Sequence, residues 1–353
     1  MNHARRSFLI VRLSAIGDVV MASPLVGALR ARYPDSRITW LVQPECRDLL
    51  SANPQIDEVV VWARGRWREA CRTFHWLTLL REILSLRATL RRLQIDTAID
   101  AQGLLKSGLL TRLSGAPTRI GLGSREGSAL LMTQLVEKPV GDRHIGSEYR
   151  HLASTLGLDT SEFRMRVALT DEDRAAAAAT RSRLGLSAGY AVFCPFTTRP
   201  QKHWRTERWP ALATELRTRL GLRSIVLGGP ADASRAEAMA AAAGTELNSL
   251  AGATSLREAA ALIEGADLLV GVDTGLTHMG SAFGIPTVAL FGSTCPYLDA
   301  GRPRTVVIYK ALPCSPCKRH PTCGGAFTCM SDITVEEIVT TAGELCRRAV
   351  PAT

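Results

Sequence analysis

Residues 266–292 read ADLLVGVDTGLTHMGSAFGIPTVALFG, and this stretch indicates the fold most clearly. Residues 268–272 form a short apolar run, which predicts a strand buried in a parallel sheet. Asp273, Thr274 and Gly275 end the run, and a helical pattern follows over residues 276–282. A second apolar strand is predicted over residues 287–291. The order strand, turn, helix, strand predicts a parallel α/β sheet.

The turn from Asp273 to Gly275 is also a candidate ligand site. Such a turn directs backbone N–H groups and the positive end of a helix to one point, which suits a phosphate or sugar hydroxyls. In an open parallel sheet it lies at the carboxyl ends of the strands, where ligands bind. Asp273, Thr274 and His278 would face that ligand. The alternative is an ordinary turn in which Asp273 or Thr274 caps the helix, and this stretch alone leaves both interpretations open.

The rest of the chain repeats the same alternation of strands and helices. Strands are predicted over residues 8–13, 38–42, 59–62, 97–100, 190–194, 223–227 and 246–249. Helices are predicted over residues 22–33, 76–93, 174–184, 209–219, 234–243, 256–263 and 335–348. At 353 residues the chain is longer than one core usually supports. We therefore predict two α/β domains with parallel, doubly wound sheets, residues 1–170 and 189–334, joined by a linker over 171–188 and followed by a last helix within 335–353.

The amino-acid composition limits the kinds of binding partner that are expected. The net charge of +10 favours an anionic one: nucleic acid, an anionic lipid surface or a phosphorylated small molecule. The basic residues are scattered and are not interleaved with stacking aromatics, so no nucleic acid is expected. Nine cysteines argue against a disulfide framework in a cytoplasmic chain.

The expected location is the cytoplasm. No apolar run reaches the roughly 18–20 residues that a membrane span needs. Arg5 and Arg6 precede an apolar stretch that imitates a signal peptide, but Arg12 and Asp18 interrupt it.

Polar residues follow the predicted strands of the first domain. Asp18 could accept a proton from an attacking hydroxyl, although capping a helix is the commoner local role. Its loop lacks G-x-G-x-x-G, which disfavours a nicotinamide oxidoreductase. Arg64, Arg66 and Arg68 match carboxylates and phosphates, or form a solvated basic loop. Lys106 lies in a first helical turn, where a cation is unfavourable unless it holds an anion.

The second domain offers a polar loop and a cysteine-rich one. Thr197, Thr198 and Lys202 follow its first strand, and Lys202 suits a diphosphate unless it is a surface lysine. A later loop with the spacing C-x2-C-x5-C-x5-C contains Cys314, Cys317, Cys323 and Cys329. Four thiolates could bind zinc, but the later spacings fit no standard finger. Any such metal would be structural, and the sequence leaves its presence open.

Together these stretches resemble the bacterial lipopolysaccharide heptosyltransferases, glycosyltransferase family 9, over nearly the whole chain. The most specific parts are RLSAIGDVVMASPLVGALR (12–30), DTAIDAQGLLKSGLLTRL (96–113), TTRPQKHW (197–204) and VDTGLTHMGSAFGIPTVALFGSTCP (272–296). RGRWREA and AQGLLKS look most like the first heptosyltransferase of the inner core. The segment PCSPCKRHPTCGGAFTCMSDIT resembles other members, including the second heptosyltransferase.

The resemblance implies a GT-B fold, two Rossmann-like domains with parallel sheets facing a central cleft. The second domain would hold most of the donor and the first the acceptor, and in the family the C-terminal helix often returns to pack on the first domain. The implied reaction is inverting transfer of L-glycero-D-manno-heptose from ADP-heptose to a Kdo or heptose hydroxyl of nascent lipopolysaccharide. It needs no catalytic metal or cofactor. Kdo2-lipid A or its heptosylated form would be met at the cytoplasmic face of the inner membrane.

The resemblance also implies roles for individual residues. Asp18 matches the proposed general base and Lys202 the lysine on the donor phosphates, which makes them the catalytic pair. The implied donor-binding residues are Thr197, Thr198, Asp273, Thr274, Gly275 and His278. The acceptor-binding residues are Arg66, Arg68 and Lys106.

Two further functions are compatible with these motifs. One is that of a second-step or other family 9 transferase that acts on a heptose or on an acceptor outside lipopolysaccharide. The other is that of a regulator that binds a nucleotide sugar or zinc without catalysis. The presence of both Asp18 and Lys202 speaks against the regulator.

Overall fold

The computed structural model describes residues 6–294 and 297–347. The chain forms two compact units. Unit 1 contains Met1–Asp142 and Gly146–Ala168, and unit 2 contains Arg143–Ile145 and Leu169–Thr353. Within the described residues, no helix combines the length and apolar character that crossing a bilayer requires.

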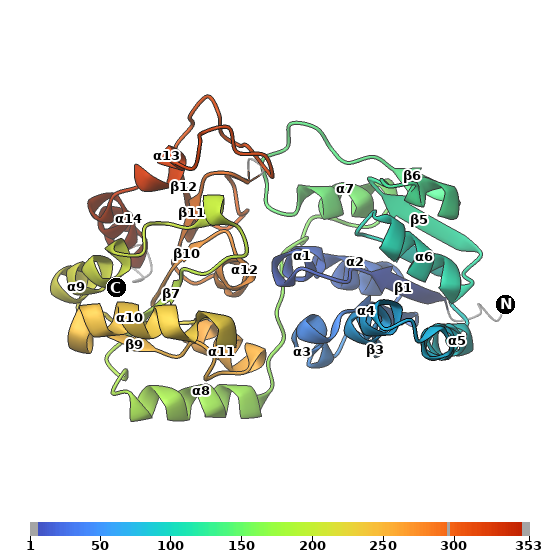
Figure 1. Cartoon of the computed structure of the whole chain (residues 1–353), viewed down its shortest axis with the longest axis horizontal. Coiled ribbons are helices and arrows are strands. Elements are labelled where there is room, and N and C mark those ends of the chain that lie inside the picture. Colours follow the sequence, from blue (N-terminus) through green and yellow to red (C-terminus); the bar gives the residue numbers. More distant parts are fainter. Residues whose placement is uncertain (1–5, 295–296, 348–353) are drawn as a thin grey trace. The chain divides into compact units, whose positions relative to one another are not determined.

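Unit 1 is built on a parallel sheet of six strands in the order β3-β2-β1-β4-β5-β6 (Figure 1). The strands are β1 (Ser7–Val11), β2 (Arg37–Val42), β3 (Glu58–Val61), β4 (Thr97–Asp100), β5 (Thr118–Leu122) and β6 (Gln134–Val136). The helices are α1 (Ile16–Ala22), α2 (Pro24–Arg32), α3 (Arg47–Ser51), α4 (Arg64–Arg72), α5 (Trp76–Arg92), α6 (Leu105–Ser114) and α7 (Ser147–Thr155).

Unit 2 repeats this plan with the sheet order β12-β11-β10-β7-β8-β9. The strands are β7 (Tyr190–Cys194), β8 (Arg223–Val226), β9 (Leu247–Ser249), β10 (Leu268–Val272), β11 (Thr287–Phe291) and β12 (Thr305–Tyr309). The helices are α8 (Asp171–Arg183), α9 (Arg208–Leu220), α10 (Ala233–Ala243), α11 (Leu256–Glu264), α12 (Gly275–Phe283), α13 (Thr328–Ser331) and α14 (Val335–Arg347).

Both sheets have the strand order of a Rossmann fold. Counted within its unit, each sheet reads 3-2-1-4-5-6 from one edge to the other. The order reverses between the first and fourth strands, which are β1 and β4 in unit 1 and β7 and β10 in unit 2. Ligands bind outside the carboxyl ends of strands at this switch point. The predicted α/β fold with two parallel-sheet domains is confirmed.

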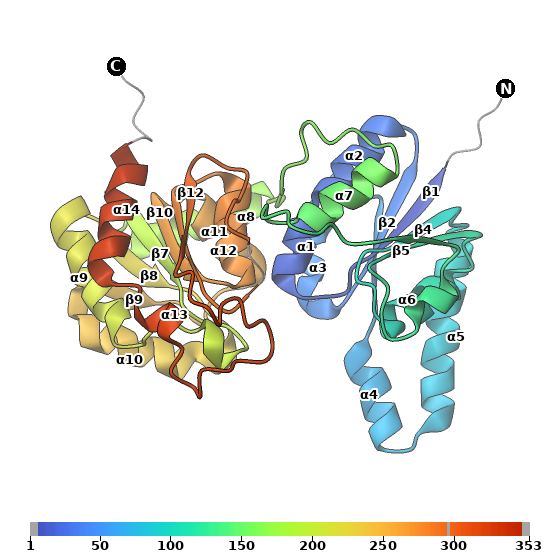
Figure 2. The same cartoon turned by 90° about the horizontal axis from the view of Figure 1, so that it is seen from above.

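Helices cover both faces of each sheet (Figure 2). In unit 1, Leu86 and Leu90 of α5 belong to a core with Leu9 of β1, while α2 and α7 contact each other on the opposite face. In unit 2, the rings of Trp204 and Trp209 meet edge to face with centroids 5.0 Å apart. Trp209 belongs to α9, and both rings pack in the core with residues of β7, while α14 packs against α9 and β11.

The buried strands agree closely with the sequence-based prediction. Residues 97–100, 190–194, 268–272 and 287–291 are strands with the predicted bounds. Strand β1 ends at Val11 and not at residue 13, because the backbone N–H of Leu13 donates to Gln102 Oε1 at 3.0 Å. The elements β5, β6, β12, α1, α3, α4, α7 and α13 were not predicted.

The predicted helix over residues 22–33 corresponds to α2, and a separate helix, α1, precedes it with a division between the two. The division lies at Ser23, whose hydroxyl donates to Val20 O at 2.7 Å, and Pro24 begins α2 because it has no N–H to continue the earlier helix. The basic stretch at 64–68 is the start of α4 and not a loop.

The junction between the units lies after Ala168. Helix α8 falls within the segment 171–188 that was predicted to be a linker. It begins with a side-chain cap, in which Thr170 Oγ1 accepts a hydrogen bond from Asp173 N at 3.3 Å, and it packs against α11 of unit 2. Arg348, the predicted end of the last helix, lies outside the described residues together with 349–353.

Candidate active site

In unit 2, the predicted donor residues meet at the switch point between β7 and β10. Lys202 ends a short 3-10 helix (Pro200–Lys202) in the loop that follows β7, and Asp273 directly follows β10. Lys202 Nζ lies 2.6 Å from Asp273 Oδ2, and the two side chains are 16% and 13% exposed. Both residues lie at the carboxyl ends of their strands, as predicted, although the sequence did not reveal the ion pair.

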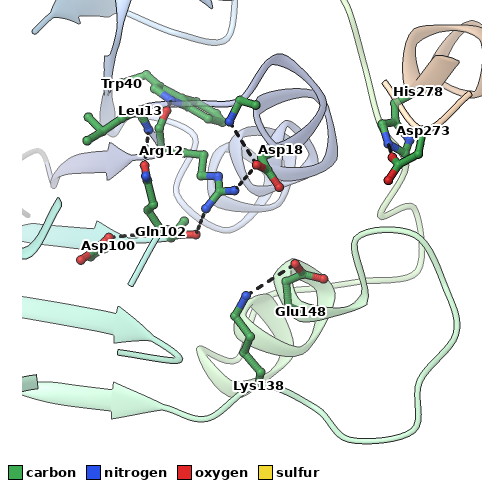
Figure 3. A network of polar contacts seen from close by, with 12 residues as sticks. Arg12, Leu13, Asp18, Trp40, Asp100, Gln102, Lys138, Glu148, Asp273 and His278 are labelled. Carbon is green, nitrogen blue, oxygen red and sulfur yellow. Dashed lines mark hydrogen bonds and ion pairs between the residues drawn. The ribbon is translucent and has the colours of Figure 1, made fainter. Parts of the chain in front are cut away.

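His278 completes this cluster from the first turn of α12. Its Nε2 lies 3.4 Å from Asp273 Oδ1, and the two side chains are drawn together in Figure 3. Burial by itself would raise the pKa of Asp273. The hydrogen bond from His278 and the positive charge of Lys202 outweigh burial and hold this pKa well below its usual range. Asp273 is therefore a fixed negative charge beside Lys202 at neutral pH.

We expect unit 2 to become less stable at acid pH because Asp273 becomes protonated. Because its pKa is depressed in the folded protein, its contribution to stability is complete above the unfolded value of about 3.9 and is lost as the pH falls below it. We expect the difference in free energy of unfolding between wild type and Asp273→Asn to shrink by about 1 kcal/mol from pH 5 to pH 3. Urea unfolding at both pH values measures this, and a constant difference would contradict the assignment.

Helix α12 begins directly beside this cluster. Its N-cap residue is Thr274, but the Thr274 side chain makes no capping hydrogen bond, so the hydroxyl is not consumed by the helix. Thr277 Oγ1 instead donates to Val272 O at 2.6 Å and ties the helix to β10. A Cβ on Gly271 would lie 2.2 Å from Thr277 Oγ1, so glycine permits this close packing. The N-terminal N–H groups of α12, starting at Gly275, thus point out beyond the strand ends.

The two threonines of the β7 loop differ in their surroundings. Thr197 Oγ1 donates to Asp273 O at 3.4 Å, and His203 Nε2 lies 3.0 Å from Thr197 O. Thr197 therefore connects the loop to the Asp273 turn. Thr198 is exposed, and its place in the same loop leaves its donor role a prediction.

In unit 1, Asp18 lies in the first turn of α1 and not at its cap. The N-cap residue is Ala15, whose backbone N–H donates to Asp18 Oδ2 at 3.0 Å. The same oxygen lies 2.5 Å from Nη2 of Arg12, whose side chain is 9% exposed (Figure 3). Both contacts use Oδ2, so Oδ1 takes part in neither. The side chain of Asp18 is 34% exposed and is accessible to an incoming hydroxyl.

The sequence did not reveal the group that orients Asp18. Arg12 Nη1 also donates to Ala101 O at 3.2 Å, and its guanidinium lies 5.8 Å from the ring centroid of Tyr149. The guanidinium is thereby positioned by the loop after β4 and by α7 as well as by its own loop. An arginine directly after an apolar strand was the available signal, but its partner Tyr149 is too distant in the sequence to suggest this arrangement.

The loop after β4 is organised by Asp100, which is fully buried. Its Oδ1 accepts hydrogen bonds from the N–H groups of Gln102 and Gly103 at 3.0 Å each, and its Oδ2 accepts one from Ser107 Oγ at 3.0 Å. Burial raises the pKa of Asp100, and these hydrogen bonds act against that rise. Asp100 is structural: it shapes the turn that leads into α6, the helix that carries Lys106.

Lys106 and Arg64 form a local excess of positive charge. Burial lowers the pKa of Lys106, the charges of Arg64 and Arg12 lower it further, and Glu126 acts in the opposite direction. A positive group whose pKa is lowered by other positive groups is stabilised by a bound anion. The predicted anion-binding character of Lys106 therefore extends to Arg64, which was not among the predicted acceptor-binding residues.

Arg66 and Arg68 lie on helix α4 and are exposed. Arg66 Nη1 lies 3.5 Å from Glu82 Oε1 of α5, a surface pair that contributes little to stability. Both guanidinium groups are therefore accessible from solvent, and their acceptor role stays a prediction.

The cysteine-rich segment contacts the loop of unit 2 that contains Lys202. Gln201 Nε2, next to Lys202, donates to Lys318 O at 3.2 Å, and Lys318 N donates to Ser293 O at 2.6 Å. Burial, followed by the neighbouring thiols, raises the pKa of Cys329, which indicates that the four cysteines gather in one region. Among residues 6–294 and 297–347, no three or more His, Cys, Asp or Glu side chains are arranged to hold a metal ion.

Comparisons with known proteins agree on one family. Residues 83–325 match the family model described as Glycosyltransferase family 9 (heptosyltransferase). Lipopolysaccharide heptosyltransferase 1 of Pseudomonas aeruginosa is 31% identical over 321 residues, which cover 89% of this chain and 86% of that protein. Lipopolysaccharide heptosyltransferase 1 of Escherichia coli K12 is 29% identical over 313 residues, which cover 86% of this chain and 93% of that protein.

Solved structures agree as well. The structure of E. coli heptosyltransferase WaaC with ADP is 27% identical, has a TM-score of 0.73 and covers 96% of this chain and 99% of its own. A glycosyltransferase family 9 protein from Veillonella parvula has a TM-score of 0.79 at 23% identity and covers 99% of both chains. The similarity therefore extends over both units.

Proposed function

Because this chain belongs to glycosyltransferase family 9, as its motifs predicted, we propose that it is an inverting heptosyltransferase of the lipopolysaccharide inner core. It moves L-glycero-D-manno-heptose from ADP-heptose to the Kdo region of nascent lipopolysaccharide. Its relatives are heptosyltransferases, and one of their structures contains ADP. The observation that carries the proposal is the pairing of Lys202 with Asp273 at the start of α12.

In this proposal unit 2 binds the donor. An ammonium group has three N–H donors, so Lys202 can keep its bond to Asp273 and still donate to a phosphate oxygen. The first turn of α12 adds backbone N–H groups and the positive end of the helix dipole. Thr197, Thr274 and His278 lie around the same point and provide polar groups for the sugar and the diphosphate.

Unit 1 supplies the base and the acceptor site. Asp18 takes the proton of the acceptor hydroxyl, whose oxygen forms the new bond to the anomeric carbon of heptose while the bond from that carbon to the diphosphate breaks. ADP leaves with additional negative charge, which Lys202 stabilises; one such preorganised contact is worth about 3 kcal/mol. The predicted residues Arg66, Arg68 and Lys106, together with Arg64, provide positive charge for the carboxylates and phosphates of Kdo2-lipid A.

We place the protein in the cytoplasm, bound peripherally at the inner-membrane face. A net charge of +10 attracts it to anionic lipid. The proposed acceptor is anchored in that same surface, so an enzyme held there meets its acceptor without leaving the membrane.

The choice between a first-step and a second-step enzyme is tested with two acceptors. We expect transfer from ADP-heptose to Kdo2-lipid A and little transfer to the same acceptor already carrying one heptose, because the positive cluster at Lys106 suits an exposed Kdo carboxylate. Product formed only on the heptosylated acceptor would make this a second-step enzyme. ADP binding without product on either acceptor would overturn the proposed acceptor but not the family.

A further inference from the structure

Unit 1 carries an unusual concentration of exposed apolar side chains. In the part of the chain that the structure describes, the ten exposed large hydrophobic residues all lie between residues 74 and 140. Half of them belong to the helical hairpin of α4 and α5, here called the α4–α5 arm (residues 64–92). These are Phe74 (75% exposed), Trp76 (58%), Leu77 (74%), Leu80 (51%) and Leu84 (49%). Figure 2 shows the arm extending from the sheet of unit 1.

The exposed residues form a stripe along α5 and do not pack into the core. Leu77, Leu80 and Leu84 are three and four residues apart, a spacing that places them on one side of a helix. Leu86 and Leu90 of the same helix are buried in the core of unit 1. At the tip of the arm, the rings of Phe74 and Trp76 meet edge to face with centroids 6.0 Å apart. Helix α5 therefore has a second apolar side that unit 1 does not cover.

The arm is also strongly basic. Residues 64–92 contain eight arginines and two glutamates. Both glutamates already face arginines of the arm: Arg72 lies 2.7 Å from Glu69, and Arg66 lies 3.5 Å from Glu82. The exposed Arg81 and Arg87 lie on α5 itself, close to the apolar stripe. The positive excess is therefore displayed beside the apolar side chains.

We propose that the α4–α5 arm docks this protein on an anionic phospholipid bilayer. A helix with an apolar stripe beside arginines lies in the plane of a membrane, with the apolar side chains at the boundary of headgroups and acyl chains and the arginines on lipid phosphates. A second copy of this chain fits less well, because two arms of equal positive charge repel each other. The proposal deepens the proposed function by naming the surface that reaches the membrane. The docking itself does not depend on heptose transfer. Only its role, which is to bring the enzyme to its acceptor, rests on the proposed function.

Vesicle binding tests the docking surface. The wild type and the triple variant Trp76→Ser, Leu77→Ser, Leu80→Ser are sedimented with vesicles of phosphatidylglycerol and phosphatidylethanolamine, and with neutral phosphatidylcholine vesicles. We expect the wild type to bind the anionic vesicles and the triple variant to bind at least about tenfold more weakly. The variant Arg81→Glu, Arg87→Glu should lose binding most at low salt. The matched control is Leu130→Ser, because Leu130 is 91% exposed in unit 1 outside the arm and its loss should change little.

Two further readouts distinguish membrane docking from misfolding of the variants and from self-association. Transfer to a deacylated, water-soluble acceptor should be equal in wild type and in the arm variants, which shows that they fold and that docking is separate from catalysis. Inactive wild-type protein that still binds vesicles through the arm would overturn the proposed function alone. Undiminished vesicle binding by the triple variant would overturn the docking surface. A wild type that is dimeric, with a triple variant that is monomeric, would also overturn it, because the apolar stripe would then be a self-association surface.

Discussion

Replacing Asp18 with alanine is expected to lower kcat for heptose transfer by about 10²–10⁴-fold, the usual range for loss of a general base. The dissociation constant for ADP should change little, because the residues proposed to hold ADP belong to unit 2 and Asp18 belongs to unit 1. Coupled ADP-release kinetics and calorimetric ADP titration measure the two effects. Normal turnover in the alanine variant would remove Asp18 from the mechanism.

The surroundings of Asp18 require a second variant. Its carboxylate accepts the N–H of Ala15 and faces the buried guanidinium of Arg12, so alanine also leaves a buried charge without its partner. The stability cost should be about 1–3 kcal/mol, below the value for a fully buried pair because Asp18 is 34% exposed. Asp18→Asn keeps an acceptor for Ala15 N and most of the shape. If it is folded and equally inactive, the loss belongs to the chemistry and not to unfolding.

Buried parallel strands could be predicted from the sequence with accurate bounds. The runs at residues 190–194 and 268–272 are apolar throughout because both faces of their strands are covered by helices. The short edge strand β6 (Gln134–Val136) has two exposed residues and lacks that pattern, which is why it was missed. The basic stretch at Arg64 was expected to be a loop because it follows a strand, but its side chains allow the regular helix α4 that packs against α5.

The sequence predicted which residues belong to the candidate site but not which of them contact each other. Lys202 and Asp273 follow different strands, and only the sheet order, in which β7 lies beside β10, brings them within 2.6 Å. Sequence patterns indicated the strands but not that order. Arg12 shows why a residue of the site can be missed altogether. Its guanidinium is buried against residues from the loop after β4 and from α7, and no local pattern distinguishes it from a surface arginine.

Replacing Lys202 with methionine is expected to lower kcat by about 10²–10³-fold, because the departing diphosphate loses its preorganised cation. Affinity for ADP should fall as well, in contrast to Asp18→Ala. Lys202→Arg keeps the charge but not the compact ammonium, so its activity should lie between those of wild type and the methionine variant. Full activity in Lys202→Met would contradict the proposed role on the donor.

Stability separates the catalytic role of Lys202 from its structural one. In Lys202→Met, Asp273, which is 13% exposed in the wild type, should keep its contact with His278 but loses the ammonium, so unit 2 should lose about 1–3 kcal/mol. The double variant Lys202→Met, Asp273→Asn removes the uncompensated carboxylate and should recover part of that loss. Because the double variant still lacks the cation, its activity should stay as low as that of Lys202→Met. Recovery of stability without recovery of transfer would assign Lys202 to the diphosphate, whereas recovery of both would reduce it to a partner of Asp273.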